Sequence, residues 1–367
     1  MFLHTPSKYK IYATSQAAWD GMFASINTAK KSIYWEVYVF VDDEVGVNFF
    51  NKLEQKAKEG IDVKLVIDYL GSFWLSRKRI KSLRDSGIDL QLFNIRKHKY
   101  RGLWKQLWTR THRKILIVDE TIGFIGGVNI QKEMRDWLDI HMKLNGSVVH
   151  SLLRSFAKSY LISGGKRLEI RHLLHYKTRV NHHTLQFIYD DAHKKKSTVK
   201  KKYIESLTKA RERVILFSPY YFPDRDFVQA LWQARKRGVN IDLLVPLRTD
   251  IRIATYAAYA WFGIIRKLGV NIHQTQQMMH GKGIIVDDNW AMIGSSNITQ
   301  DSFFDHYEAN ISFENKKVIK KLNKTLKNWI KKATPLTDKI WEKRGKIQKI
   351  KEWIGLKLYT FWHRRRL

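Results

Sequence analysis

The chain has no cysteine. This absence excludes disulfide bonds, cysteine-based structural zinc and catalysis by a thiol, and it agrees with a reducing compartment without proving one. The 14 histidines leave histidine and carboxylate metal sites open in principle. No HExxH or EF-hand spacing occurs, however, so we expect no metal, no other cofactor and no loss of rate in a chelator.

Long apolar runs are also missing. The longest uncharged one extends from Ile253 to Ile265, which is shorter than the about 20 residues that a membrane span needs. It fits either a core helix or an interfacial helix near the mouth of a site. Met1 to Lys31 lacks the apolar stretch and cleavage site of a secretory signal, so we expect no export.

Acidic residues are scarce, with 34 Asp and Glu against 67 Lys and Arg, a net charge of +33. Such a charge concentrates polyanions, which means nucleic acid or an anionic membrane. The 13 tryptophans and 16 tyrosines favour a lipid interface, although stacking on bases uses the same residues.

What the chain does contain is one motif written twice. Each copy reads His-x-Lys, four residues, Asp, six residues, Gly-Gly or Gly-Ser, one residue, and Asn. The copies are His112, Lys114, Asp119, Gly126, Gly127 and Asn129, then His280, Lys282, Asp287, Gly294, Ser295 and Asn297. Two copies in register at this spacing are not accidental, and a duplicated structural hairpin is the alternative.

The residue types predict a hairpin. Alternation along a strand would put His112 and Lys114 on one face. A tight turn at Asp119 or Asp287 would then bring the return strand and its Asn beside the His-Lys pair. Glycine and serine before each Asn would let backbone N–H groups and hydroxyls approach an anionic oxygen, so we expect Asn129, Asn297, Ser295 and Ser296 to bind phosphate.

Two imidazoles with two ammonium groups suit a phosphodiester. The lysines and asparagines would stabilise charge on its oxygens. One histidine would attack phosphorus to give a phosphohistidine, while the other would protonate the leaving alkoxide.

The paired pattern resembles the duplicated HKD motif of the phospholipase D superfamily. The similarity runs from about Ser32 to about Asn328, and four stretches resemble bacterial cardiolipin synthases: Glu36 to Phe40, Ile67 to Ser72, Ser218 to Asp224, and Met278 to His280. The resemblance implies an α/β, duplicated phospholipase D-like fold in which two pseudo-symmetric α/β/α halves share one active site. Many such synthases begin with two membrane spans, so the chain is similar to the branch without them.

Further roles follow from the resemblance. Asp139 lies 27 residues after His112 and Glu308 lies 28 residues after His280, where the family has carboxylates that orient the histidines. Asp119 and Asp287 belong to the catalytic motif, and the resemblance implies that they hold the hairpin more than they touch substrate. Glu36 is expected either near the site or as a structural partner.

Alternating helix and strand patterns agree with an α/β sheet, and the second half repeats their order. We predict a first half over residues 1–182, a second half over 183–330 and a basic amphipathic tail over 331–367. His193 to Lys202 reads as a mobile connector, and Arg96 to Arg110 as a basic rim with Trp104 and Trp108. In the tail, Ile340, Ile347, Ile350, Ile354, Leu358 and Phe361 recur at helical spacing.

The resemblance favours a cardiolipin synthase-like phosphatidyltransferase that converts two phosphatidylglycerol molecules to cardiolipin and glycerol. His112 is the nucleophile by family analogy, although the symmetry permits the reverse. The partner would be an anionic phospholipid membrane containing phosphatidylglycerol and cardiolipin, bound peripherally at the cytoplasmic face of a bacterial cell, rather than nucleic acid. The alternatives are a phospholipid hydrolase and a nuclease or other phosphodiesterase of the same superfamily.

Overall fold

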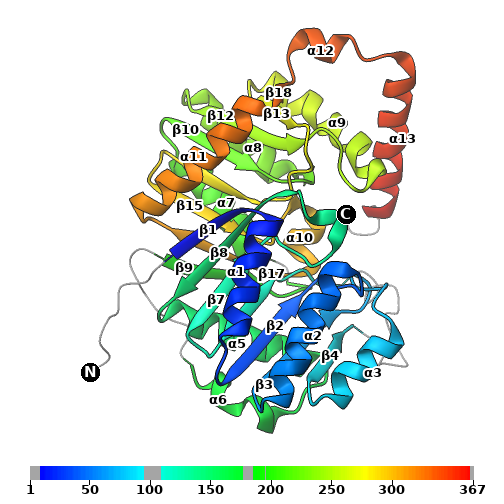
Figure 1. The fold of residues 1–367 in the computed structure, drawn as a ribbon. Helices are drawn as coiled ribbons and strands as arrows, with labels where there is room; N and C mark the ends of the chain where they lie inside the picture. The colour runs from blue at the N-terminus through cyan, green and yellow to red at the C-terminus, as the bar shows by residue number, and fades with distance from the viewer. Residues whose placement is uncertain (1–8, 95–108, 177–184, 195, 364–367) are drawn as a thin grey trace.

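The computed structural model describes residues 9–94, 109–176, 185–194 and 196–363, and its main features are two β-sheets with helices packed on them (Figure 1). The first sheet has the strand order β1-β8-β7-β6-β2-β3-β4. Its strands are β1 (Tyr9–Thr14), β8 (Leu138–Asn145), β7 (Ile122–Gly126), β6 (Ile115–Val118), β2 (Ser32–Val37), β3 (Asp62–Asp68) and β4 (Asp89–Phe93).

Helices cover both faces of this sheet. One core cluster joins it to α1 (Ser15–Asn27), α2 (Glu44–Lys58) and α3 (Arg77–Asp85), and a different cluster joins it to α5 (Val148–Ile162). Alternating residues of one strand serve the two clusters, since Trp35 belongs to the first and Tyr34 to the second. The remaining short helices are η1 (Lys132–Met134), η2 (Arg167–Ile170) and α6 (Arg171–Leu174).

The second sheet repeats the seven strands of the first and adds β18 and β5. Its order is β18-β13-β12-β10-β14-β15-β17-β5, and β9 also pairs with β17. The strands are β18 (Thr334–Pro335), β13 (Asn271–Thr275), β12 (Asn240–Pro246), β10 (Arg213–Phe217), β14 (Gly283–Val286), β15 (Trp290–Gly294), β17 (His306–Phe313), β5 (Arg110–Thr111) and β9 (Leu185–Asp190). From β9 to β13 the order matches that from β1 to β4, which confirms the duplicated α/β fold.

The helices of the second half also repeat those of the first. They are α7 (Thr198–Lys209), α8 (Arg225–Lys236), α9 (Arg252–Lys267) and α11 (Lys316–Lys332), with the short α10 (Gln300–Phe304) before β17. A two-stranded sheet pairs β11 (Tyr221–Phe222) with β16 (Ile298–Thr299).

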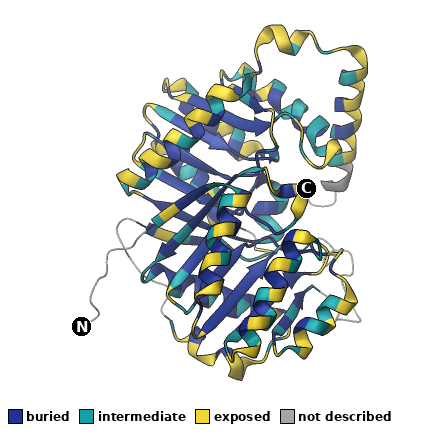
Figure 2. Ribbon diagram, in the orientation of Figure 1, coloured by how far each residue is buried: buried dark blue, intermediate teal, exposed yellow. Residues whose placement is uncertain are grey.

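The two halves share a core. One cluster contains residues of both sheets together with α5 and α11, for example Ile117, Phe156, Ile293 and Leu322. Burial is continuous through the strands, and exposed side chains are concentrated on the outer helices (Figure 2). Both halves therefore contribute to one hydrophobic interior.

The predicted alternation of helices and strands is present in both halves. β2 ends at Val37, inside the stretch from Glu36 to Phe40. The connector expected over His193 to Lys202 is wrong in its second part, because α7 begins at Thr198 and Val199 is fully buried. The rim over Arg96 to Arg110 and the boundary at residue 182 fall largely outside the described residues.

The tail forms two helices, α12 (Asp338–Glu342) and α13 (Lys346–His363), with a break that contains Gly345. The run from Ile253 to Ile265 is a core helix, α9, which buries Ala257 and Phe262 but exposes Ile253 and Ile264. α13 stands beside α9 at the right of Figure 1. Among the described residues, no helix is both long and apolar enough to cross a bilayer.

Candidate active site

Each motif contains the predicted tight turn. Asp119 and Glu120 have φ values of 52° and 56°, and Asp287 and Asp288 have φ values of 49° and 53°. Positive φ at both central residues is the backbone of a type I′ turn, which suits Asp and Asn. The turns join β6 to β7 and β14 to β15.

The aspartates of the turns anchor the hairpins. The Asp119 carboxylate accepts hydrogen bonds from the backbone N–H groups of Lys30, Lys31 and Ser32 at 2.7–3.1 Å. β6 separates Asp119 from His112, so this carboxylate lies at the far end of the hairpin from the histidine. These contacts agree with the hairpin-holding role that the resemblance implied for Asp119.

Asp287 repeats this arrangement in the second half. Its carboxylate accepts from the N–H groups of Arg211, Glu212 and Arg213 at 2.8–2.9 Å. Burial raises the pKa of Asp287, but these N–H groups outweigh that effect and hold the pKa below its usual range. Asp287 is thus also a structural residue that fixes the start of β10.

The chain before each histidine crosses to the other half. β5 pairs in parallel with β17, and the His112 N–H donates to the Tyr307 carbonyl at 2.9 Å. On the other side, Leu138 bridges Met279, and the His280 N–H donates to the Leu138 carbonyl at 2.7 Å. Residues 112–114 and 280–282 precede the regular strands β6 and β14, so the extended strand predicted from the first histidine begins three residues later.

This crossing pairs each histidine with a carboxylate of the opposite half. His112 Nδ1 lies 3.0 Å and 3.2 Å from the carboxylate oxygens of Glu308. His280 Nδ1 lies 2.8 Å from Asp139 Oδ2. Both predicted carboxylates contact a histidine, and offsets along the chain do not reveal that the pairs are exchanged between halves.

The ionisation of these pairs follows from burial. Burial and the charge of Lys114 lower the pKa of His112, and burial and Lys282 likewise lower the pKa of His280. Burial raises the pKa of each carboxyl group, but the paired histidine outweighs it, so the pKa values of Glu308 and Asp139 are lowered. Each neutral imidazole therefore donates its Nδ1 proton to an ionised carboxylate and leaves Nε2 as a base or nucleophile.

Serine side chains hold Glu308 in place. The hydroxyl groups of Ser295 and Ser302 both donate to its carboxylate, and Ser295 Oγ accepts from the Ala309 N–H at 3.0 Å. Ser296 Oγ accepts from the Asn310 amide at 2.6 Å. Ser295 and Ser296 are fully buried, and these bonds position β17 and Glu308. Their role in phosphate binding stays a prediction.

The small residues of the motif make room for protein side chains. A Cβ on Gly127 would lie 2.2 Å from Asp139 Oδ1, and a Cβ on Gly294 would lie 2.3 Å from the Asn310 amide oxygen. The Gly127 N–H donates to the Ile140 carbonyl at 3.0 Å. We expected this space to admit a substrate oxygen, but it is taken by β8 and β17.

The motif lysines lie inside the site. Lys114 Nζ donates to the His112 carbonyl at 2.7 Å, and Lys282 Nζ donates to the His280 carbonyl. Burial and the charge of Lys282 lower the pKa of Lys114 well below its usual range. Burial lowers the pKa of Lys282 to about 8, against the opposing effects of Asp139 and Glu308. A bound anion would favour the charged form of both lysines.

The asparagines differ in their contacts. The Asn129 side-chain oxygen accepts from the Val39 N–H at 3.2 Å, which ties the first motif to the chain after β2. The buried Asn297 side-chain oxygen has no hydrogen-bond partner in the described structure. A buried polar atom without a partner is costly, and a bound substrate hydroxyl could satisfy it.

Several site residues escaped sequence reasoning. Tyr38 and His306 both lie against His112, with ring centroids 4.9 Å and 5.8 Å away. Trp137 lies 5.3 Å from His280. Trp137 and His306 each stand two residues before an orienting carboxylate, and this shared offset was the signal that could have found them.

Glu36 is a structural partner beside the site. It is fully buried and accepts a hydrogen bond from the Thr111 hydroxyl group. Burial raises its pKa against the charge of Arg113. Arg113 is also fully buried and bonds the carbonyl groups of Glu308 and Asp190 in the second half. Both His112 and Arg113 of the first motif therefore bond to residues of the second half.

The fold and this site define a phosphodiester-handling enzyme with two histidines, of the phospholipase D superfamily. The family model described as "Cardiolipin synthase, PLD-like domain" matches residues 22–160 and 203–330. The chain belongs to this cardiolipin synthase family of phospholipase D-like proteins.

Curated relatives agree with this membership. Cardiolipin synthase 2 of Bacillus anthracis is 31% identical over 92% of this chain and 67% of its own length. The minor cardiolipin synthase ClsB of Bacillus subtilis is 26% identical over 93% of this chain and 86% of its own. The chain thus spans about two thirds of the first relative and most of the second.

Solved structures show the same fold at low identity. Phosphatidylserine synthase of Haemophilus influenzae has a TM-score of 0.74 at 14% identity, covering 97% of this chain and 93% of that one. Polyphosphate kinase of Porphyromonas gingivalis has a TM-score of 0.60 at 14% identity, over 91% of this chain and 49% of that one. At this identity the likeness concerns the fold alone.

Proposed function

We propose that this cardiolipin synthase-like phosphatidyltransferase transfers a phosphatidyl group from one phosphatidylglycerol to another, giving cardiolipin and glycerol. The observation that carries the proposal is the pair of histidine–carboxylate contacts, His112 with Glu308 and His280 with Asp139, each of which joins one half to the other. A transfer through a phosphohistidine needs two imidazoles with separate tasks. The buried lysines supply the positive charge that a phosphodiester requires.

In the first step His112 Nε2 attacks phosphorus. A P–N bond forms, the P–O bond to glycerol breaks, and protonated His280 gives its Nε2 proton to the departing oxygen. Burial and Lys282 lower the pKa of His280, so the free site holds it neutral. The negative charge of the bound phosphodiester raises that pKa, and His280 gains its proton when substrate binds.

In the second step the hydroxyl group of another phosphatidylglycerol attacks the phosphohistidine. Its proton passes to His280, the new P–O bond forms and the P–N bond breaks. The choice of His112 as nucleophile is supported by the surroundings of Glu308. This carboxylate accepts hydrogen bonds from three groups, the His112 imidazole and the hydroxyl groups of Ser295 and Ser302. An anchored carboxylate stabilises the positive charge that develops on the attacking ring.

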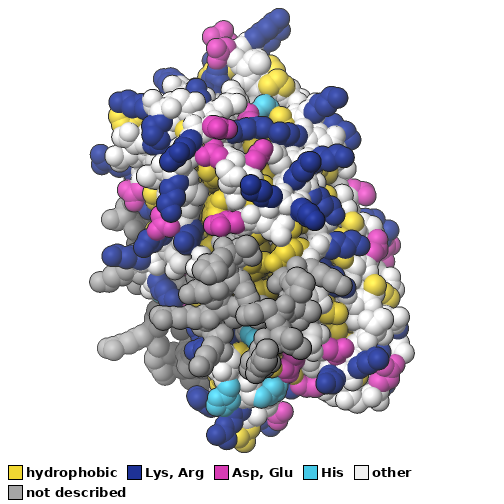
Figure 3. Space-filling model, turned by 90° about the vertical axis from the view of Figure 1, so that its left-hand side faces the viewer, with side chains coloured by type: hydrophobic (Ala, Val, Ile, Leu, Met, Phe, Trp, Pro, Cys, Tyr) yellow, Lys and Arg dark blue, Asp and Glu magenta, His cyan; other side chains and the backbone are white. Residues whose placement is uncertain are grey.

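We further propose peripheral binding to an anionic membrane, at the cytoplasmic face of a bacterial cell. Lys and Arg side chains spread over the face of the molecule in Figure 3, with fewer acidic groups among them. α13 exposes an apolar stripe of Ile347, Ile350, Ile354 and Leu358, and Trp353 is 61% exposed. An apolar stripe with basic neighbours suits a headgroup layer.

A second apolar element lies close to the site. After β3, Phe73 is exposed and Trp74 is 75% exposed. Two residues earlier than Trp74, the Ser72 hydroxyl donates to the Tyr38 carbonyl at 3.0 Å, and the Tyr38 ring contacts His112. Insertion of this loop among lipid headgroups would bring the catalytic histidine near a phosphodiester.

The test is product analysis. Purified protein is incubated with labelled phosphatidylglycerol vesicles and, separately, with single- and double-stranded DNA. Cardiolipin and glycerol are the expected products, made by a His172→Gln control, which loses an exposed imidazole, and not by His280→Ala. If phosphatidic acid were the only lipid product, the activity would be hydrolysis and not transfer. DNA cleavage without a lipid product would overturn the proposal in favour of a nuclease, the function that the +33 charge also suits.

A further inference from the structure

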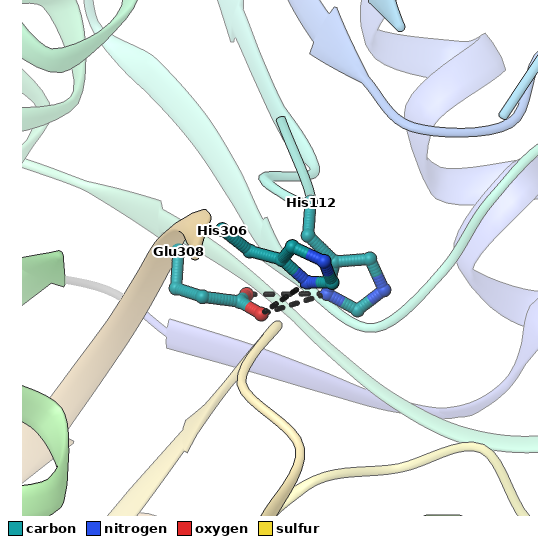
Figure 4. A group of neighbouring side chains, drawn as sticks. All are labelled: His112, His306 and Glu308. Carbon is teal, nitrogen blue, oxygen red and sulfur yellow. Dashed lines mark hydrogen bonds and ion pairs between the residues drawn. The ribbon is translucent and has the colours of Figure 1, made fainter. Parts of the chain in front are cut away.

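The His112–Glu308 pair has a third neighbour that its counterpart lacks. His306 and Glu308 stand two residues apart on β17, so both side chains point to the same face, and His112 enters from the first half (Figure 4). In the other pair the place of His306 is taken by Trp137, against which His280 lies. The two halves are therefore unequal at this position, where one has an imidazole and the other an indole.

The three side chains offer two nitrogens and an oxygen to one point. One donor atom from each residue lies within 4.8 Å of the others. Glu308 Oε1 is 3.0 Å from His112 Nδ1 and 4.0 Å from His306 Nδ1. His306 Nδ1 is buried and has no hydrogen-bond partner in the described part of the chain. The sequence showed no metal spacing because His112 stands far from the other two along the chain.

This donor set is one that zinc prefers. Two histidines and a glutamate with water in the fourth position form a recurrent tetrahedral zinc site, with ligand distances of about 2.0–2.2 Å. His306 Nδ1 and Glu308 Oε1, which lie 4.0 Å apart, would have to approach each other when an ion binds. The His306 side chain remains 22% exposed, which gives an ion a path from solvent.

The charges around His306 are mostly negative. Asp301, Glu308 and Asp305 act on it with a sign that favours a cation, and Arg110 opposes them. Lys114, whose charge acts on His112, also opposes a cation. The surroundings of His306 are therefore locally acidic, although the protein as a whole is basic.

We propose that His112, His306 and Glu308 bind a zinc-class divalent ion, and that this ion inhibits the enzyme. In the active pair the His112 proton is on Nδ1, directed to Glu308, and Nε2 carries the lone pair that attacks phosphorus. An ion can bind Nδ1 only through a lone pair on that atom. The single proton of the neutral ring therefore moves from Nδ1 to Nε2. No proton is lost from the ring, but its nucleophilic atom is blocked. The His280–Asp139 pair has tryptophan in the third place and gains no such site.

The inhibitory part of this proposal rests on the proposed phosphohistidine function, whereas ion binding does not. Binding is therefore measured by itself, from the visible absorption of Co²⁺ titrated into the metal-free full chain and its displacement by Zn²⁺. His306→Asn and His306→Gln remove the third ligand, and both variants are checked for an unchanged circular dichroism spectrum and melting temperature. His172→Gln, which removes an imidazole with half of its side chain exposed, controls for adventitious sites.

We expect the unaltered protein and His172→Gln to bind one Co²⁺ per chain with a tetrahedral spectrum. Both His306 variants should bind Co²⁺ at least about tenfold more weakly. Where turnover is measurable, Zn²⁺ inhibition should be reversed by EDTA and should weaken by the same factor in the His306 variants. Equal Co²⁺ binding in all four proteins would overturn the site. Binding that needs His306 but leaves turnover unaffected would overturn the inhibition while leaving phosphatidyl transfer intact. A total lack of turnover with intact Co²⁺ binding would count against the proposed function only.

Discussion

Glu308 of the second half orients His112 of the first half, and its Oε1 atom lies 3.0 Å from His112 Nδ1. In the same way, Asp139 of the first half orients His280 of the second half. The backbone enforces this exchange, because the N–H of each histidine bonds to the strand that carries the opposite carboxylate. Neither half alone contains a complete histidine–carboxylate pair. The duplicated fold is therefore required for the chemistry as well as for the shared core.

Replacing Glu308 by glutamine should lower kcat by about 10²–10⁴ with little change in KM, because the amide keeps the shape but no longer fixes the Nδ1–H tautomer of His112. Asp139→Asn should act similarly on His280. Steady-state kinetics on mixed micelles measures both constants. An unchanged kcat in either variant would show that the carboxylates do not orient the histidines.

His112→Ala and His280→Ala should each abolish turnover and leave the fold intact, since one imidazole cannot both attack phosphorus and donate a proton. The two variants differ in what they trap. Labelled substrate should leave a slowly formed covalent adduct on His280→Ala, detected after denaturation in alkali, because this variant keeps the nucleophile and lacks only the acid that assists the leaving group. No adduct should form on His112→Ala. An adduct on His112→Ala instead would reverse the assignment of the nucleophile.

The rate should fall as the pH rises through about 8. Burial lowers the pKa of Lys282 to about 8, so the folded protein holds this lysine charged below that pH and neutral above it. Loss of the ammonium charge removes an electrostatic contact to the phosphodiester. In Lys282→Arg the guanidinium stays charged, so any residual activity should lose this alkaline limb. The same limb in both proteins would assign the titration to another group.

Sequence patterns anticipated the parts of the site that local structure builds. The turns at Asp119 and Asp287 follow from the residue types that tolerate positive φ, and the orienting carboxylates follow from matching offsets. Contacts between the halves were not predictable, because they depend on β5 pairing with β17 across the sheets. His306 was missed for the same reason, since its nearest functional neighbour, His112, belongs to the other half.

The serines of the second motif show a different limit. Motif composition indicated small polar groups near an anion, which is correct, but the anion that Ser295 contacts is the Glu308 carboxylate rather than a substrate. Composition cannot distinguish these two anions. Only the position of β17 beside β15 decides between them.

Asp287→Ala should lower the free energy of unfolding by about 1–3 kcal/mol, because three backbone N–H groups lose an ionised acceptor. Asp287→Asn keeps one side-chain oxygen and should recover part of the loss. Thermal and urea unfolding of the two variants measure this difference. A melting temperature equal to that of the unaltered protein, with turnover lost, would instead restore Asp287 to a catalytic role.

Deletion from Thr337 onward would remove packing contacts together with the segment proposed to bind the membrane. Tyr359 stacks on Phe222 at 4.3 Å, and a Cβ on Gly355 would lie 3.0 Å from the Ala257 backbone nitrogen, so α13 packs closely on α9. Truncation should therefore lower the melting temperature as well as vesicle binding. The side chains of Phe361 and Trp362 lie outside the described residues.

Substitutions on the exposed face of α13 separate membrane binding from packing. Ile350, Trp353 and Ile354 are exposed, so changing all three to serine should leave the melting temperature unchanged. Each large apolar side chain that enters a membrane contributes up to about 1.5–3 kcal/mol, so sedimentation with anionic vesicles should weaken at least about tenfold and become more sensitive to salt. Activity toward detergent-dispersed substrate should persist. Leu168→Ser, an exposed apolar position away from α13, is the control and should bind vesicles normally. Unchanged sedimentation together with a lower melting temperature would assign this face to packing and not to the membrane.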